Sequence, residues 1–115
     1  MSNKDKFNII SILEAIEKIF EYSKDYSNAE DFINSKRDFD ASMMNFVVIG
    51  EMVCRLSDKF IEDHNQINWQ QIKGFRNIVA HNYFGIDAEE VWAIIKKHLP
   101  NLKNNLANTG SSDIG

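Results

Sequence analysis

Arg76, His81 and Tyr83 are the residues of this chain whose types and spacing suit chemistry. Arginine stays charged and offers forked donors to phosphate oxygens. Histidine titrates near neutral pH and can transfer protons. RNA carries its own nucleophile, the 2′-hydroxyl, so an Arg–His pair could cleave it. A base would deprotonate the hydroxyl, an acid would protonate the leaving 5′-oxygen, and Arg76 would stabilise charge on the phosphate.

Helical spacing joins only two of these residues directly. At about 100° per residue, Tyr83 returns to within about 20° of Arg76, whereas His81 lies about 140° away. His81 therefore joins the other two only if the helix loosens before Gly85, or if a neighbouring subunit completes the site. A symmetric dimer would bring two copies of His81 together, one as base and one as acid. Spacing alone fits equally well a structural role, in which Arg76 caps carbonyls or pairs with a glutamate.

Gly50 and Glu51 form a second candidate feature. A glycine inside a helix costs about 1 kcal/mol relative to alanine, so Gly50 predicts the close approach of another helix or subunit. Glu51 either faces solvent or orients a catalytic partner. Cys54, the only cysteine, is predicted to be a buried core thiol, and it leaves no intramolecular disulfide or cysteine metal cluster.

Apolar residues at helical spacing predict the elements that position these residues. The first helix should span about Lys4–Tyr26, and a capping box of Ser27 and Glu30 should open a short helix. Residues 36–40 are predicted to form a bend. A long helix should then run over about Phe39–His64, with His64 exposed in a polar turn.

Two further helices complete the prediction. Asn68 should cap a helix that ends near Tyr83 or Phe84, because Gly85 is a natural stop. Asp87 and Glu90 should cap the last helix reciprocally, with Ile86 stapled onto Val91. The apolar face of this helix comprises Val91, Ile95, Leu99, Leu102 and Leu106. Pro100 should kink or interrupt it, and the polar residues 107–115 are predicted to form a flexible tail.

Composition narrows the class of protein. The 115 residues suffice for one domain, predicted over residues 1–106, and the scarcity of glycine (5) and proline (1) favours an all-helical fold. A net charge of −4 counts against a nonspecific nucleic-acid binder, whose surface is usually basic. No segment resembles a signal peptide or a membrane span, so a cytoplasmic protein without membrane partners is expected.

The ordered motifs resemble those of HepT-like toxins, a branch of the HEPN ribonuclease superfamily. The signature Arg-x-x-x-x-His-x-Tyr is matched by Arg76, His81 and Tyr83, and the similarity extends from the first helix to about Leu106. The other matching segments are Val48-Ile49-Gly50-Glu51, Leu56-Ser57, Ile67-Asn68-Trp69, Gly74-Phe75-Arg76-Asn77, Tyr83-Phe84-Gly85-Ile86-Asp87 and Val91-Trp92.

This resemblance implies an antiparallel bundle of four to five helices that dimerises near its active sites. It also implies a metal-independent endoribonuclease toxin, with Arg76 and His81 catalytic and Asn77 orienting the phosphate or His81. The partner would be a small nucleotidyltransferase antitoxin that transfers AMP from ATP to Tyr83. That modification would block substrate and compete for the Arg76 guanidinium.

One departure from the family pattern leaves an alternative open. Relatives often carry an arginine just before the helix-two asparagine, whereas this chain has Met44 before Asn45. RNA binding could therefore be weaker or differently placed. The alternative function is a non-catalytic partner that docks a nucleotidyltransferase, with Tyr83 mainly a modification site.

Overall fold

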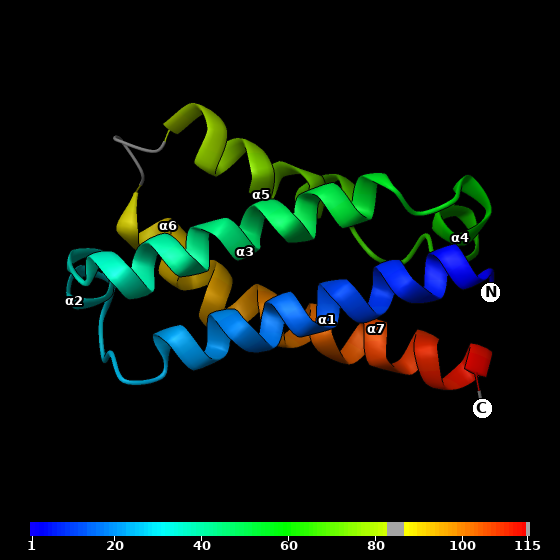
Figure 1. Ribbon diagram of the computed structural model, residues 1–115, viewed down its shortest axis with the longest axis horizontal. Helices are drawn as coiled ribbons and strands as arrows, with labels where there is room; N and C mark the ends of the chain where they lie inside the picture. Colours follow the sequence, from blue (N-terminus) through cyan, green and yellow to red (C-terminus); the bar gives the residue numbers. More distant parts are fainter. Residues whose placement is uncertain (83–86, 115) are drawn as a thin grey trace.

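The computed structural model describes the backbone of residues 1–82 and 87–114, and the side chains of residues 1–79 and 87–109. The described residues form helices and no strand. Four long segments run alternately up and down: α1 (Asn3–Ser23), α3 (Lys36–Cys54), α5 (Trp69–Asn82) and a C-terminal helix (Figure 1). Close packing joins α1 to α3 and to α7, and α3 to α5. The predicted all-α antiparallel bundle is confirmed.

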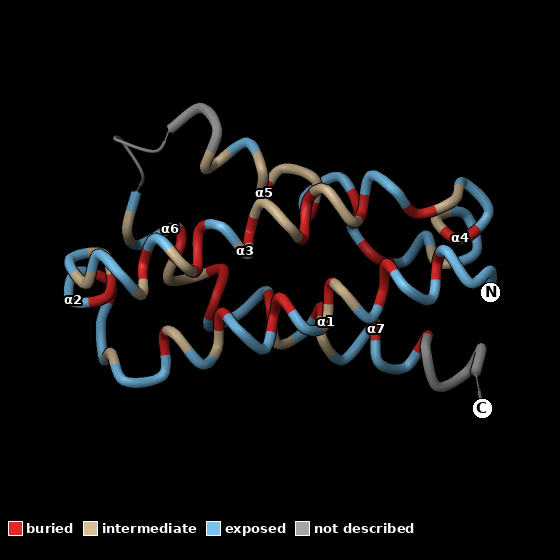
Figure 2. Tube along the Cα trace, in the orientation of Figure 1, coloured by how far each residue is buried: buried red, intermediate tan, exposed pale blue. Residues whose placement is uncertain are grey.

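Buried residues recur along the tubes of these segments (Figure 2), and their apolar side chains build one core. All five residues of the apolar face predicted for the last helix are buried, as are Phe39, Met43, Phe46, Val53 and Phe60 of the predicted long helix. No described helix combines the length and hydropathy needed to cross a membrane. Burial of the helical stripes is thus the main force that assembles the bundle.

The connection between α1 and α3 differs in detail from the prediction. Helix α1 ends at Ser23, three residues earlier than expected, and α2 spans Ala29–Asn34. The cap of α2 is Asn28 and not Ser27, because the Asn28 side-chain oxygen accepts a hydrogen bond from the Asp31 amide at 2.9 Å. The predicted bend at residues 36–40 is wrong: these residues open α3, and the chain turns one position earlier, at Ser35.

The long helix predicted over Phe39–His64 is broken. Helix α3 ends at Cys54 and α4 spans Asp58–Asp63. The break is held from outside, because the buried Asp5 carboxylate accepts hydrogen bonds from the Ser57 amide at 2.8 Å and the Ser57 hydroxyl at 2.6 Å. The Ser57 hydroxyl oxygen in turn caps α4 by accepting from the Phe60 amide at 3.1 Å.

Two side chains near this break lie differently from their predicted places. Cys54 is exposed and not a core thiol, because the last turn of α3 presents it to solvent just before the chain leaves the helix. His64 is half-buried rather than exposed, with its ring stacked near that of Phe60 at 4.2 Å between centroids.

Replacing Asp5 by asparagine is expected to lower the free energy of unfolding by about 1–3 kcal/mol at pH 7. Burial opposes ionisation of Asp5, but the hydrogen bonds from Ser57 outweigh it and lower the pKa of this carboxyl below its ordinary value of 3.8. A group with a lowered folded-state pKa stabilises the fold above its unfolded pKa, and this contribution disappears as the pH falls through the folded value.

Urea unfolding at pH 7 and at pH 3 measures this effect. The stability difference between wild type and Asp5→Asn should shrink at the lower pH. Asp25→Asn, a change at an exposed aspartate in the loop after α1, serves as the control and should have little effect. Equal losses for the two variants would contradict the assigned role of Asp5.

The predicted N-terminal caps Asn68 and Asp87 are confirmed, since each side chain accepts a hydrogen bond from a backbone amide in the first turn of its helix. The Asn68 side chain accepts from the Gln71 amide at 3.1 Å at the start of α5. The Asp87 side chain accepts from the Glu89 amide at 3.0 Å and the Glu90 amide at 3.4 Å. The predicted staple through Ile86 lies outside the described residues.

The C-terminal helix consists of α6 (Ala88–Ala93), a π-helical segment η2 (Ile94–His98) and α7 (Leu99–Ile114). Pro100 cannot donate a backbone hydrogen bond, and the wider turn before it accommodates the proline without ending the helix. The predicted interruption is therefore a π-helical turn. Helix α7 continues to Ile114 with Thr109 buried, whereas disorder was expected from about residue 107; the domain boundary at residue 106 stays a prediction.

Candidate functional site

The backbones of α3 and α5 lie close together where Gly50 meets Arg76. A Cβ atom built on Gly50 would lie 2.8 Å from the Arg76 Cβ and 3.3 Å from the Arg76 amide nitrogen. Only glycine fits there without moving α5. The close approach predicted from a glycine inside a helix is confirmed, and its partner is the α5 helix of the same chain.

Arg76 and Glu51 form an ion pair directly beside this contact. The Arg76 Nη1 donates to the Glu51 Oε1 at 2.9 Å, and this hydrogen bond raises the pKa of the Arg76 guanidinium. The two side chains are 41% and 42% exposed, so solvent screens the pair and it contributes little to stability. Its main effect is to orient the guanidinium while solvent still reaches it.

Glu51 engages one of the five N–H donors that an arginine carries. A half-exposed guanidinium, fixed at its root by helix packing and at its tip by a carboxylate, is well suited to hold a phosphate group. Of the two roles that the sequence left open for Glu51, orienting a partner is the one that the geometry supports.

The structure places the other predicted site residues only in part. Asn77 is exposed on α5 and follows Arg76 directly. His81 belongs to the last turn of α5, and its side chain lies outside the described residues. Tyr83 lies outside them altogether. The described site is therefore Arg76 with Glu51 and Gly50, and the relation of Arg76 to His81 and Tyr83 stays a prediction.

Met44 lies on the same face of α3 as Glu51, seven residues and about two turns earlier. Its side chain is 64% exposed, and a methionine brings no hydrogen-bond donor to this surface. The neighbouring Asn45 donates to the Ala41 carbonyl at 2.9 Å. The face of α3 that carries Glu51 therefore presents an exposed apolar side chain at position 44, and its effect on RNA binding stays a prediction.

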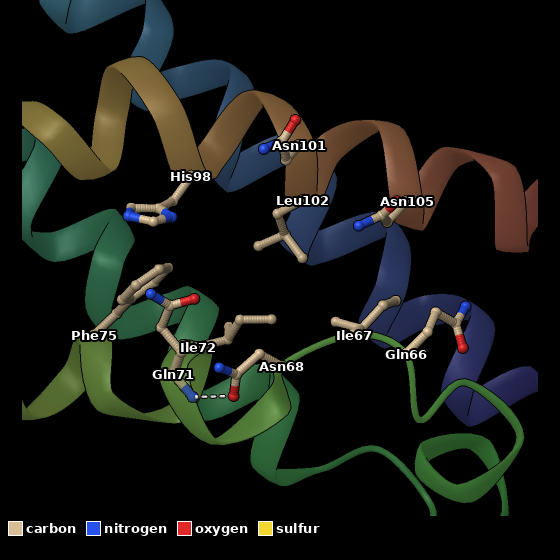
Figure 3. A pocket seen from close by; sticks show the side chains of 10 residues that line it. All are labelled: Gln66, Ile67, Asn68, Gln71, Ile72, Phe75, His98, Asn101, Leu102 and Asn105. Atoms are coloured by element: carbon tan, nitrogen blue, oxygen red, sulfur yellow. Dashed lines mark hydrogen bonds between the residues drawn. The ribbon is translucent and has the colours of Figure 1, made fainter.

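The sequence did not predict a hollow that lies between α5 and the C-terminal helix, whose rim is rich in asparagine and glutamine (Figure 3). The amide-rich segments at residues 65–71 and 101–108 were visible in the sequence. Their pairing across the bundle was not, because it depends on tertiary packing.

Comparison with known proteins places the chain among ribonuclease relatives. The family model described as Ribonuclease HepT-like matches residues 12–108. A candidate RNase of Methanocaldococcus jannaschii is 35% identical over 107 residues, which cover 92% of this chain and 97% of that protein. The "Probable ribonuclease HepT" of Thermococcus cleftensis is 31% identical over 103 residues, covering 90% and 93%.

A second M. jannaschii protein, named as a gamma-glutamylcyclotransferase and candidate RNase, is 38% identical over 101 residues. The match covers 88% of this chain but only 45% of that protein, so this chain spans less than half of its length. No solved structure matches this chain.

Proposed function

Because the chain belongs to the ribonuclease HepT-like family, we propose that it is an endoribonuclease that cleaves RNA by attack of the 2′-hydroxyl. The observation that carries the proposal is the Arg76 guanidinium, half-exposed and oriented by Glu51 at 2.9 Å. Two relatives that match this chain over nearly their whole length are named as ribonucleases, which supports the same activity here.

The proposed reaction assigns one task to each residue. A histidine base removes the proton of the 2′-hydroxyl, and the 2′-oxygen attacks the adjacent phosphorus. The bond between phosphorus and the 5′-oxygen breaks as an acid protonates that oxygen. The products are a 2′,3′-cyclic phosphate and a free 5′-hydroxyl. Arg76 stabilises the negative charge on the phosphate oxygens, and Asn77 orients the scissile phosphate or His81.

A homodimer supplies the two proton-transfer groups that this reaction needs. Each chain contributes one His81, and a two-fold axis beside the C-terminal end of α5 would pair them. The dimer would also double the local cationic charge from Arg76.

The proposed function also includes the role of a toxin whose ribonuclease activity is blocked by an antitoxin. A nucleotidyltransferase antitoxin would join the Tyr83 oxygen to the α-phosphorus of ATP and release pyrophosphate. The resulting phosphodiester and adenosine would occupy the phosphate site and pair with Arg76. The two-residue spacing of Tyr83 from His81 supports this proposal, because an adduct there would lie beside the proton-transfer group.

Cleavage of single-stranded RNA in the presence of a chelator tests the proposed activity. The protein is first confirmed by intact mass to carry no adenylyl group. Fragments ending in 2′,3′-cyclic phosphate are expected, with unchanged rate after metal removal, because the 2′-hydroxyl and side chains supply all reacting groups. Absence of cleavage by unmodified protein, or loss of activity in chelator, would overturn this mechanism.

A second candidate function is supported by the exposed Met44. In it the domain is a non-catalytic docking partner of a nucleotidyltransferase, and Tyr83 is mainly the residue that is modified. Unmodified protein that cleaves no RNA but binds such an enzyme would favour this function.

A further inference from the structure

Charged residues make up 26% of the chain, but they are absent from the described lining of the hollow between α5 and the C-terminal helix. Its volume is about 190 Å³, and its polar lining consists of carboxamides and one imidazole. These polar residues are Gln66, Asn68, Gln71, His98, Asn101 and Asn105. The described lining includes no aspartate, glutamate, lysine or arginine.

The floor of the hollow is apolar. Ile72 and Phe75 of α5 face Leu102 of α7, and all three side chains are buried. In Figure 3 the His98 and Leu102 side chains point from the C-terminal helix toward Phe75 and Gln71. A flat group entering the hollow would therefore lie on apolar atoms with amides along its edge.

This combination fits a nucleobase better than a phosphate or an ionic ligand. A carboxamide presents a donor and an acceptor side by side, which is the pattern of hydrogen-bonding groups along a base edge. Bases that leave the stack of single-stranded RNA are held by amides and by aromatic rings such as histidine. The Asn68 oxygen caps α5, which leaves its amino group as a donor toward the rim.

The hollow also extends along α5 in the direction of position 81, whereas Arg76 lines neither this hollow nor the next one along the helix and faces α3. A neighbouring hollow shares Gln71, Phe75 and His98 with it and continues past Gly74 and Ile78. Position 81 follows Gly74 by seven residues, which is two turns further along α5 and about 20° around it. The distance along the helix from Gln71 to position 81 is about 15 Å, a span of a few nucleotides.

We propose that the amide-lined hollow between α5 and α7 binds one nucleobase of the RNA strand, a few nucleotides from the cleaved bond. The proposal rests on the proposed ribonuclease function for the identity of the strand. The neighbouring hollow carries Glu90, which repels phosphate, so the base rather than the backbone enters the groove. Base contacts of this kind select the position of cleavage without requiring a basic surface.

The test measures binding with uncleavable strands. Fully 2′-O-methylated oligonucleotides of adenine, cytosine or uracil, and an abasic strand of equal length, are compared by fluorescence anisotropy. Wild type should bind one homopolymer about tenfold or more tightly than the abasic strand, since stacking and edge contacts to one base are lost in the abasic strand. The pocket variant Gln71→Met with Asn105→Leu should lose this preference and bind all strands within about threefold.

A matched control uses the adjacent amides. Gln70 and Asn104 are exposed on the same two helices but line neither hollow. Gln70→Met with Asn104→Leu should therefore keep the wild-type preference. Urea unfolding checks that both double variants remain folded, as expected for exposed positions.

The outcomes separate this proposal from the ribonuclease proposal. Protein that cleaves RNA but binds base-containing and abasic strands equally would overturn the base pocket and leave the nuclease intact. Protein that cleaves no RNA but shows a base preference abolished only in the pocket variant would support the base pocket and overturn the nuclease. Loss of preference in both double variants would also overturn the pocket.

Discussion

RNA cleavage by His81→Ala and by Arg76→Ala is expected to fall by about 10²–10⁴-fold and about 10²–10³-fold, respectively. The first estimate is the usual contribution of a general acid or base, and the second is that of a group stabilising developing charge. Single-turnover cleavage at saturating enzyme measures both.

Two companion variants separate chemistry from stability. Arg76→Lys keeps the charge but loses the forked donors, so it should recover only part of the rate. Glu51→Gln removes the negative partner of the 2.9 Å ion pair and should reduce the rate less than Arg76→Ala. All variants should unfold at urea concentrations close to that of wild type, because the Arg76 and Glu51 side chains are half-exposed. Undiminished cleavage by His81→Ala would refute its catalytic role.

Replacing Gly50 by alanine is expected to destabilise the fold and reduce cleavage together. The added Cβ would lie 2.8 Å from the Arg76 Cβ, an atom that cannot move unless α5 shifts. Overpacking of this kind costs about 1–3 kcal/mol, which outweighs or offsets the gain of about 1 kcal/mol in helix propensity. Because the displaced residue is Arg76, cleavage should fall more than tenfold even where the variant is fully folded.

Gly74→Ala is the matched control for Gly50→Ala. Gly74 also lies inside a helix, but a Cβ there meets nothing within 4 Å. The substitution should therefore stabilise the fold by about 0.5–1 kcal/mol through helix propensity and a less flexible unfolded chain. Urea unfolding compares the free energies of unfolding of the two variants. If both substitutions stabilise the fold, α5 can move away from the added Cβ at position 50 without loss of stability, and the prediction for Gly50→Ala is wrong.

Local signals predicted the fold well where the contacts are local. Asn68 and Asp87 could be predicted as caps from residue type and position, because a cap needs only an amide two or three residues later in the chain. The break between α3 and α4 was missed because its cause, Asp5, is 52 residues from Ser57 in sequence. Asn28 and Ser27 are both good capping residues, and the choice between them depends on how α2 packs.

The residues of the candidate site were predictable from the sequence, but their contacts across helices were not. Gly50 indicated a close helix contact, and the motif indicated Arg76, but the pairing of Arg76 with Glu51 across two helices became visible only in three dimensions. The hollow lined by Gln71 and Asn105 was beyond reach, since exposed amides carry no periodic signal that would align α5 with α7.

The packing of α1 against both α3 and α7 has a consequence for synthesis. Helix α1 needs α7 to bury its apolar stripe, so the bundle closes only after Leu106, which is fully buried, has emerged from the ribosome. Until then the hollow beside α5 lacks the wall that α7 provides. A nascent chain would thus lack the complete hollow until the residues of α7 have been synthesised.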